Sequence, residues 1–580
     1  MAFATSGLRP SRSTLLGGLA VAALVAGTAL AQTAGQITED SYQPPMQRMT
    51  GLLVFSGEPG LAPPPGAEGL SIRLSDVAVE GALPGSDAEV AALRARLTGK
   101  RIAVSEIFAA ASELEAAYAR MGYVLARVVI PEQTLEDGGP LRLTVVNGYV
   151  ERVDASSAPA PLRTRLEAMT APLVDRPSLR LPDIERRLLL AGDMFGVALG
   201  SALSTGARPG GTVVILNPQF RSITGFFGLD NSFSKDLGRL NFSSGLEFNN
   251  HLGWGEVFYV RASGHPGLGS DSYFSDGPKL RTLAGGAVFP MGHDGLTFGV
   301  EAANSRTGPD TDGIASDSDF DRLSFRLYYP VVRSVRRNIA VTAALDMQSD
   351  RQDLDTIAGD FQLYKDRTRV LRLTGEGTWE LSDNSAFRVG STLSVGLDGL
   401  GARSASDATP NLPLSRQGAD ADFQKLELSF SYNRGFRQDW SLTLAGQAQT
   451  SFGTPLLSSE QFGIASTEGL SAFDLGTVTG DSGWFVRSEV ARNIPVRRAG
   501  RPLIVSPYLF AAVGAVDLEN PTADEASRVG ASSFGLGVDL NLVRDPNYSS
   551  ASVRFEYGIG NRDDGQDDPE RFTIVSSYRF

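Results

Sequence analysis

Residues from about Gln219 to the final Phe580 alternate apolar and polar side chains at every second position. In the stretch DFQKLELSFSYN, for example, Leu426, Leu428 and Phe430 alternate with polar or charged residues. Alternation at period two is typical of a β-strand with one apolar and one polar face. About sixteen such segments follow one another, and helical periodicity is absent from this region. The alternation therefore predicts an all-β structure of about sixteen antiparallel strands.

The connections between these segments alternate in length and charge. Short turns such as MGHDG and FRQD follow even-numbered segments, and long loops such as TGPDTDGIASDSDFD follow many odd-numbered ones. Several short turns are basic, as in VRSVRRN, whereas long loops such as RDDGQDDPE are acidic. An up-and-down transmembrane barrel shows this alternation, and a soluble sandwich has no reason to do so. The pattern predicts a transmembrane β-barrel, whose closed sheet pairs its backbone groups within lipid.

The polar face of each predicted strand lines the barrel lumen. The charged residues expected there are Arg372, Glu376, Glu380, Lys425, Glu427, Arg554 and Glu556. Sixteen strands enclose a lumen too wide for wall side chains to fill, which leaves an aqueous channel unless another segment plugs it.

The N-terminus has the features of an export signal. Arg9 and Arg12 precede the apolar run LLGGLAVAALVAGTALA, which ends in Ala29-Leu30-Ala31. A basic start, an apolar centre and a small-residue exit predict a secretory signal peptide over residues 1–31. The chain contains no cysteine, which suits an oxidising compartment.

Two further regions separate the signal from the barrel. Residues 32–69 are predicted to be a linker, because SGEPGLAPPPGAEG carries too much Pro and Gly to pack. Residues 70–218 mix strand and helix patterns, such as SIRLSDVAVEG and SEIFAAASELEAAYARMG. Two β-α-α-β-β units fit this region best, one at 70–148 and one at 149–218, ahead of a barrel at 219–580.

Composition and motifs argue against catalysis and nucleic-acid binding. The net charge of −13 gives no electrostatic footprint for nucleic acid. No GxxxxGK[ST], GxSxG or HExxH motif is present, and the three histidines stand apart from one another. The acidic run DTDGIASDSDFD lacks EF-hand spacing and is interpreted as a solvated loop. We expect no enzyme activity, no cofactor and no metal.

Local motifs resemble those of two-partner secretion transporters, in which two POTRA domains precede a sixteen-stranded barrel. GYVLARVVIPEQ resembles the helix-to-strand segment of the first POTRA domain, and LPDIERRLLLAGDMFGV resembles the helix of the second. GFFGLDNSFSKDLGR and EFNNHLGWGE resemble the first barrel hairpin and the turn after it. GDSGWFVRSEV resembles the strand that follows the longest loop.

This resemblance implies a transporter in the outer membrane of a Gram-negative bacterium, with its POTRA domains in the periplasm. Such a protein binds a secreted, TpsA-like exoprotein in the unfolded state and exports it without nucleotide hydrolysis. An extended client can add as a strand to the open edge of a POTRA sheet. The client-contact candidates are Gly122, Tyr123, Arg127 and Pro131. Other expected partners are outer-membrane lipid and, during biogenesis, the outer-membrane assembly machinery.

The sequence departs from the family at the tip of the sixth external loop. The family has a Val-Arg-Gly-Phe/Tyr tip, whose Arg is expected to pair with an Asp of a Phe-x-Asp-x-Gly strand. Here Ser471, Ala472 and Phe473 occupy the tip. Ala512 and Gly514 occupy the strand positions. We therefore expect another contact to hold this loop, such as Phe473 packing against the wall.

A second departure concerns the N-terminal helix that plugs the pore in many members. Pro44-Pro45 breaks any long helix within residues 34–56, which argues against a plug made only of that segment.

Two other functions stay open. An outer-membrane protein assembly or insertion factor of the wider POTRA–barrel superfamily would usually carry more POTRA units. A porin-like solute channel would not need periplasmic client-binding domains.

The last strand, RFTIVSSYRF, is expected to close the barrel by pairing with the first strand near residues 221–231. Phe572, Tyr578 and Phe580 then face lipid. A terminal aromatic also resembles the C-terminal signal by which outer-membrane barrels are recognised for assembly.

Overall fold

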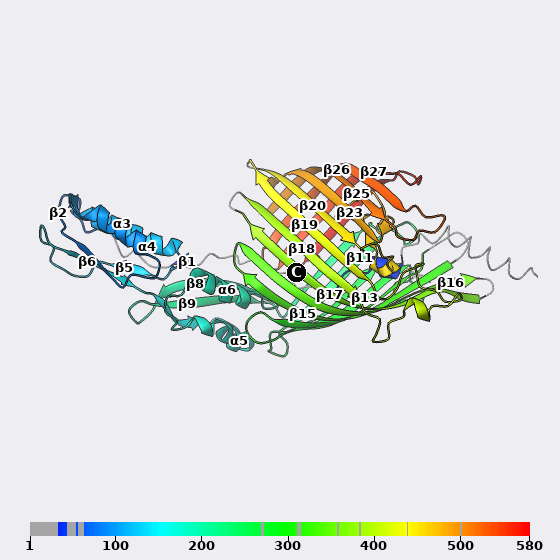
Figure 1. The fold of residues 1–580 in the computed structure, drawn as a ribbon, viewed down its shortest axis with the longest axis horizontal. Coiled ribbons are helices and arrows are strands. Elements are labelled where there is room, and N and C mark those ends of the chain that lie inside the picture. Colours follow the sequence, from blue (N-terminus) through cyan, green and yellow to red (C-terminus); the bar gives the residue numbers. More distant parts are fainter. Residues whose placement is uncertain are drawn as a thin grey trace, which may run out of the picture.

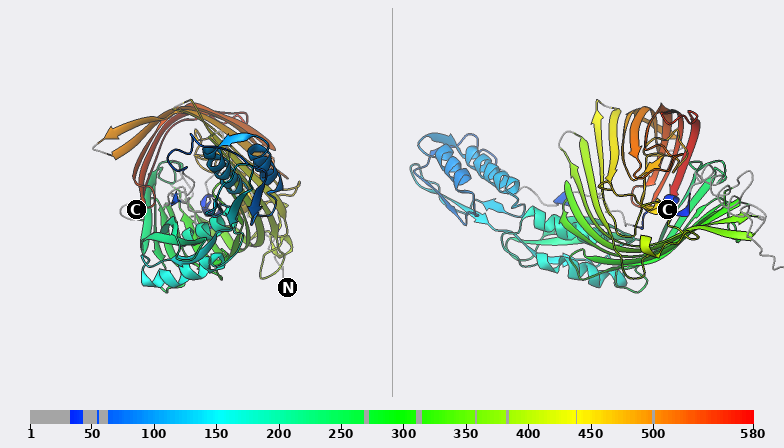
Figure 2. Two further views of the ribbon diagram at one scale, coloured as in Figure 1. Left: turned by 90° about the vertical axis from the view of Figure 1, so that its left-hand side faces the viewer. Right: turned by 45° about the vertical axis from the view of Figure 1, so that its right-hand side comes forward.

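The fold is described from a computed structural model. It describes residues 33–42, 54–55 and 63–580, apart from 268–271, 310–314, 357–358, 382–383, 438 and 499–500. The expected signal peptide and Pro44-Pro45 lie outside these residues. Two small α/β units extend in a row from one end of a β-barrel (Figures 1 and 2).

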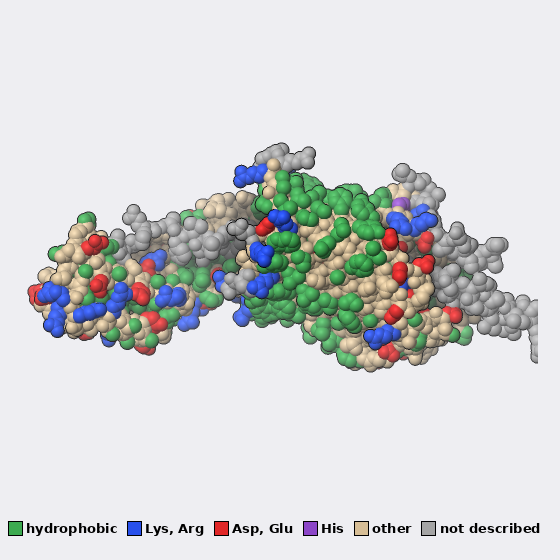
Figure 3. All heavy atoms as spheres, turned by 90° about the horizontal axis from the view of Figure 1, so that it is seen from above, with side chains coloured by type: hydrophobic (Ala, Val, Ile, Leu, Met, Phe, Trp, Pro, Cys, Tyr) green, Lys and Arg blue, Asp and Glu red, His purple; other side chains and the backbone are tan. Residues whose placement is uncertain are grey.

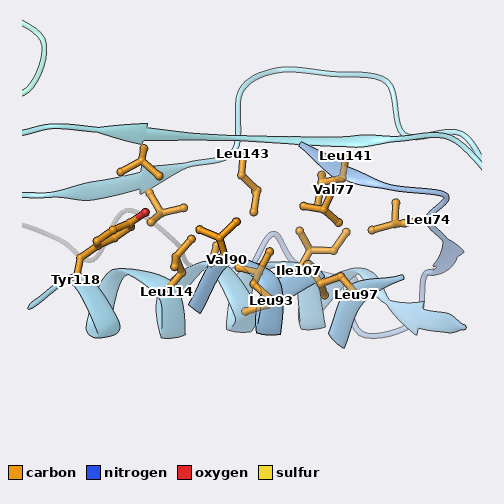
Figure 4. Close-up of a cluster of buried hydrophobic side chains, with 14 of the residues drawn as sticks. Leu74, Val77, Val90, Leu93, Leu97, Ile107, Leu114, Tyr118, Leu141 and Leu143 are labelled. Carbon is orange, nitrogen blue, oxygen red and sulfur yellow. The ribbon is translucent and has the colours of Figure 1, made fainter. Parts of the chain in front are cut away.

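The first unit has the expected β-α-α-β-β order. Its elements are β2 (Ser71–Arg73), β3 (Val77–Glu80), α3 (Asp87–Leu97), β4 (Arg101–Ala103), α4 (Val104–Arg120), β5 (Arg127–Val129) and β6 (Leu141–Val146). The main sheet has the order β3-β6-β5, and β2 pairs with β4. Ile107 and Leu114 of α4 point toward Leu141 and Leu143 of β6 (Figure 4). Apolar residues at helical spacing form the core-facing side of α4.

The second unit repeats this order and ends against the barrel. Its elements are β7 (Tyr149–Asp154), α5 (Ala160–Thr170), the 3₁₀ turn η1 (Ala171–Leu173), α6 (Leu181–Gly192), β8 (Val197–Thr205) and β9 (Gly211–Phe220). Its sheet has the order β1-β8-β9-β7, in which β1 (Val54–Phe55) comes from the linker. None of the helices among the described residues is long and apolar enough to cross a bilayer.

The rest of the chain forms a closed antiparallel barrel. Its strand segments are β10 (Ile223–Asp230), β11 (Asn241–Asn249), β12 (Val257–Gly264), β13 (Leu280–Pro290), β14 (Thr297–Thr307), β15 (Ala315–Arg333), β16 (Arg337–Thr356), β17 (Gly359–Glu380), β18 (Ser385–Gly396), β19 (Gln424–Phe436), β20 (Trp440–Thr450), β23 (Ser482–Arg492), β24 (Ile494–Arg498), β25 (Arg501–Asp517), β26 (Arg528–Asp545), β27 (Ser549–Arg562) and β28 (Glu570–Arg579). Because β23 and β24 pair with β25 in one continuous register, they count as one strand. The described residues therefore form sixteen strands, and the predicted fold class is confirmed.

The two faces of the barrel wall differ as the alternation predicts. Outward-facing apolar side chains form a wide hydrophobic band, and basic side chains line the rim nearest the POTRA domains (Figure 3). Leu371, Leu373 and Leu509 of this band are 48%, 56% and 66% exposed, respectively, as expected for side chains that meet lipid. The intervening residues face the lumen.

Short elements outside the barrel sheet fold into the lumen or over its outer end. They are α2 (Ala34–Ile37), η3 (Ala405–Asp407), η4 (Ser458–Glu460), β21 (Phe462–Gly463) and β22 (Thr479–Gly480). Of these, α2 belongs to the linker, and η4, β21 and β22 belong to the loop between β20 and β23.

Candidate functional site

The lumen holds an N-terminal segment, residues 33–42, against the wall formed by β14 and β15. The Tyr42 amide donates to Glu301 Oε2 at 3.0 Å, and Arg322 Nη2 donates to the Glu39 carbonyl at 2.8 Å. Arg326 Nη1 donates to the Tyr42 carbonyl at 2.7 Å. These wall residues bind mainly the backbone of the segment, so they recognise an extended chain more than a particular sequence.

Tyr42 gives the segment its main side-chain contact. Its ring lies 4.6 Å from the Tyr259 ring, between centroids, and 4.4 Å from the Arg261 guanidinium carbon. Its hydroxyl donates to Glu247 Oε1 at 2.8 Å. Tyr42 thereby fixes the end of the segment at the inner wall of β11 and β12.

The expectation that Pro44-Pro45 breaks a long plug helix falls on residues outside the described range and stays a prediction. The helical part of the segment is the single turn Ala34–Ile37, so the described residues contain no long plug helix. Residues 33–42 nevertheless occupy the lumen, because polar wall residues bind their backbone without needing a helix.

A second segment, residues 451–481 between β20 and β23, also crosses the lumen, and we call it the pore loop. Its base is anchored by Glu460, which is 1% exposed. Arg372 Nη2 lies 2.6 Å from Glu460 Oε1, and Lys425 Nζ lies 3.0 Å from Glu460 Oε2. Arg372 also pairs with Asp346 at 2.7 Å. This four-residue cluster is charge-balanced, which makes its burial tolerable.

The tip of the pore loop reaches the opposite wall through Ser471. The Ser471 hydroxyl donates to Glu556 of β27 and accepts from Arg487 Nη1 of β23 at 2.7 Å. Arg487 also pairs directly with Glu556, and Tyr508 donates to Glu556 Oε2 at 2.6 Å. Ser471, Arg487 and Glu556 are each at most 5% exposed. The serine therefore bridges a buried ion pair that belongs entirely to the barrel wall.

Apolar packing supports the same tip. Ala472 and Phe473 belong to a buried cluster that includes Ala512 of β25. A Cβ placed on Gly560 would lie 2.9 Å from the Phe473 ring. Gly560 thus leaves the space that the Phe473 ring occupies. The structure brings the predicted tip residues together with Ala512, and Gly514 lies beside Phe485 of the same cluster.

The sequence comparison missed Arg487 as part of the loop contact. Arg487 is the direct cross-strand neighbour of Ala512, so the guanidinium stands on the wall beside the position where the family pattern has an Asp. Glu556 was predicted to face the lumen, but its pairing with Arg487 depends on the register of strands far apart in sequence. The motif GDSGWFVRSEV contained Arg487, and its inward position was the available signal.

The four POTRA positions separate into two pairs. The Gly122 carbonyl accepts from the Leu181 amide at 2.8 Å, and Arg180 Nη2 donates to the Tyr123 hydroxyl at 3.0 Å. Gly122 and Tyr123 therefore lie at the junction of the two units, and Tyr123 is 4% exposed. Arg127 is exposed on β5, at an edge of the first sheet, and Pro131 follows that strand.

The linker covers part of one POTRA edge. Val54 and Phe55 of β1 pair in parallel with Ala202 and Leu203 of β8. This two-residue pairing occupies a short part of the nine-residue strand β8.

The second α/β unit binds one end of the barrel directly. Arg333 pairs with Asp193 through Nη2 and Oδ1 at 2.6 Å. The Tyr548 hydroxyl donates to the Gly196 carbonyl at 3.0 Å. A cavity of about 100 Å³, lined in part by Met169 of α5, lies along this contact. These contacts place the second unit at the inner mouth of the lumen.

The final strand closes the barrel. Phe227 of β10 pairs with Tyr578 of β28, and the amides and carbonyls of Gly225 and Phe580 exchange hydrogen bonds at 3.0 Å. Phe572 and Tyr578 are 54% and 43% exposed on the outer face. The Phe580 ring stacks on Tyr578 at 5.9 Å.

The described residues contain no group of three or more His, Cys, Asp or Glu side chains arranged to hold a metal ion.

Comparison with known proteins agrees with this architecture. A transporter named CdiB from Escherichia coli O6:K15:H31 is 27% identical over 439 residues, which cover 74% of this chain and 70% of that protein. A protein named heme/hemopexin transporter protein HuxB, from Haemophilus influenzae strain 86-028NP, is 21% identical over 415 residues, covering 70% of each chain.

Solved structures show the same fold. CdiB from Escherichia coli superposes with a TM-score of 0.64 at 20% identity and covers 100% of both chains. CdiB from Acinetobacter baumannii gives a TM-score of 0.55 at 16% identity, covering 98% of both chains.

The family match covers more than half of the sequence. Residues 72–148 match the ShlB-type POTRA domain, and residues 210–540 match the family described as haemolysin secretion/activation protein ShlB/FhaC/HecB. With its two POTRA units, closed sixteen-stranded barrel and occupied lumen, this chain belongs to the ShlB/FhaC/HecB family of outer-membrane two-partner secretion transporters.

Proposed function

We propose that the protein exports one large, TpsA-like exoprotein from the periplasm to the cell surface in an unfolded state. The observation that carries this proposal is a polar lumen closed by two segments of the same chain, residues 33–42 and the pore loop. Each segment is anchored to the wall by its own contacts. Residues 33–42 are held by hydrogen bonds and one aromatic contact, and the pore loop by Glu460 and Ser471. Because neither segment is part of the barrel sheet, their departure would leave the wall closed and open a path for polypeptide.

Client capture is assigned to β8 of the second POTRA unit, a strand that becomes the sheet edge wherever β1 does not pair with it. An extended client adds to a sheet edge through backbone hydrogen bonds, which do not depend on its sequence. The two-residue pairing of β1 with β8 is short enough for a longer client strand to displace. Arg127 and Pro131, at and after the edge strand β5, offer a second client contact on the first unit, whereas Gly122 and Tyr123 contact the second unit at the junction.

The driving force in this proposal is folding of the client outside the cell. The chain contains no phosphate-binding GxxxxGK[ST] motif. A client that folds at the surface cannot return through the lumen, so its folding free energy makes transport directional.

Gene deletion tests the function as a whole. We expect loss of one exoprotein from the cell surface, with recovery when the gene is restored. Loss of many outer-membrane proteins would instead favour an assembly factor. Altered solute permeability with an unchanged surface proteome would favour a porin-like channel.

Cysteine cross-linking tests client capture, because the natural chain has no cysteine. Ala202→Cys on β8 should form a disulfide with a cysteine placed in the N-terminal region of the unfolded client. Ser156→Cys, exposed elsewhere on the same unit, is the matched control. Equal cross-linking at both positions would contradict capture at the β8 edge.

A further inference from the structure

Three basic residues follow one another on the outer face of β17. Lys365, Arg367 and Arg369 alternate with Asp366 and Thr368, which are each 1% exposed and face the lumen. Since side chains alternate between the two faces of a strand, the three cations share the outward face. Arg367 is the most exposed of the three.

The apolar band begins directly below these cations. The next outward residues of β17 are Leu371 and Leu373, which are 48% and 56% exposed, and no charged residue follows on this face before Leu381. Charge and lipid-facing surface therefore meet between Arg369 and Leu371.

The position of the cations along β17 corresponds to the interface between the outer leaflet and the external water. Arg369 lies eleven residues from Glu380 at the periplasmic end of the strand. With about 3.3 Å per residue and a tilt of about 45°, Arg369 stands about 26 Å above that end, close to the height of the apolar band of such barrels. Arg367 and Lys365 extend about 5 and 9 Å further, into the headgroup layer.

The positive charges of these residues are not neutralised within the described chain. Arg369 donates to the carbonyls of Leu400, Gln348 and Thr368 at 3.0, 3.1 and 2.7 Å. No carboxylate of the described residues forms an ion pair with Lys365, Arg367 or Arg369. By contrast, Arg351, which lies opposite Lys365 on β16, pairs with Asp319 at 3.1 Å.

The loop beside these residues is built to hold them in place. The Arg403 amide donates to the Arg367 carbonyl at 2.9 Å, and the Leu397 amide donates to the Arg369 carbonyl at 2.8 Å. The loop thus continues the sheet where β18 has ended. Leu400, whose carbonyl Arg369 binds, is 65% exposed and adds an apolar side chain beside the guanidinium.

We propose that Lys365, Arg367 and Arg369 form a binding site for the phosphates of lipid A in the outer leaflet. Lipid A carries phosphates on its headgroup and acyl chains below them, which matches a surface with cations above and leucines below. Arg367 and Arg369 bind a phosphate by charge-assisted hydrogen bonds, and Leu371 and Leu373 contact the acyl chains. The site is independent of the lumen and fixes the height of the barrel in the membrane.

The test uses the full-length protein in detergent with added lipid A. The double variant Arg367→Gln/Arg369→Gln is compared with Arg528→Gln, a 64%-exposed outer arginine whose charge Asp517 pairs at 3.6 Å. Native mass spectrometry measures bound lipid A, and heat-dependent gel migration verifies that each barrel is folded. If each cation near the surface contributes about 1 kcal/mol, the double variant should bind lipid A roughly 30-fold more weakly. Arg528→Gln should bind like the natural protein.

Two further arms identify the ligand. With dephosphorylated lipid A, the natural protein and the double variant should bind nearly equally, because the phosphates that the arginines bind are gone. Equal retention of lipid A by both proteins would overturn the proposal. Thermal stabilisation by inorganic phosphate equal to that by lipid A would also overturn it, by assigning the site to free anions. If the double variant fails to fold, Arg367→Gln alone gives the same comparison with a smaller expected loss.

Discussion

Replacing Ser471 by alanine is expected to loosen the tip of the pore loop without disturbing the barrel wall. The hydroxyl links the loop to Glu556 and Arg487, and alanine removes both hydrogen bonds. The Arg487–Glu556 ion pair stays intact, so no isolated charge is created. We estimate a loss of about 1.5–3 kcal/mol for the docked tip, the usual range for a hydrogen bond to a charged group. That loss changes the ratio of docked to undocked loop by about 10- to 150-fold.

Single-channel recording in planar bilayers measures this change as the open fraction of the pore. Ser466→Ala is the matched control, because the Ser466 hydroxyl accepts from the Gly469 amide within the loop and, among the described residues, forms no hydrogen bond to the barrel wall. An open fraction of Ser471→Ala within threefold of that of Ser466→Ala would refute the reasoning.

A double-mutant cycle with Glu556→Gln tests whether the hydroxyl acts through the wall pair. If it does, Ser471→Ala should have a smaller effect in the Glu556→Gln background than in the natural protein. Additive effects would show that the two residues act independently, and the bridging role of Ser471 would be abandoned.

Three other changes probe separate contacts. Arg326→Gln removes the hydrogen bond to the Tyr42 carbonyl and should raise the open fraction of the pore severalfold. Unchanged conductance would show that residues 33–42 do not close the pore. Ser471→Arg should destabilise the docked tip, because it places a second cation beside Arg487. Adding Ala512→Asp should restore docking in the double variant. Purely additive conductance changes would contradict the proximity of residues 471 and 512. Deleting Phe580 removes the hydrogen-bond pair with Gly225 and should lower the yield of folded barrel more than the transport rate per folded molecule, as measured by heat-dependent gel migration and secretion assays.

The sequence predicted the barrel well because the signal is local and repeated. Alternation within each strand assigns residues such as Arg372 and Lys425 to the lumen, and the structure places both there. Glu460, their partner, lies in a loop without periodicity, and nothing local marks it. The ion cluster forms only when β17 and β19 curve around the loop, which depends on closure of the whole barrel.

The loop tip shows a different limit of sequence comparison. The family pattern directed attention to Ser471 and Ala512 as places where charges are missing. The chain instead carries an arginine at 487, which stands beside Ala512 only in the strand register. A motif comparison reads positions along one strand and cannot detect a charge that lies on the neighbouring one.

The two anchors of the pore loop differ in what they leave behind when the loop moves. Release of Ser471 leaves the wall with its paired Arg487 and Glu556, whereas release of Asp474, three residues further along the tip, separates it from the buried Arg571 of β28. Release of the base removes Glu460, which leaves Arg372 paired with Asp346 and Lys425 with Glu427, whose carboxylate lies 3.7 Å away. Uncompensated charge in a confined lumen is costly, so the Ser471 contact is easier to release than either ion pair of the loop. We therefore expect opening to begin with loss of the Ser471 contact, while the Asp474–Arg571 and Glu460–Arg372 ion pairs still hold the loop.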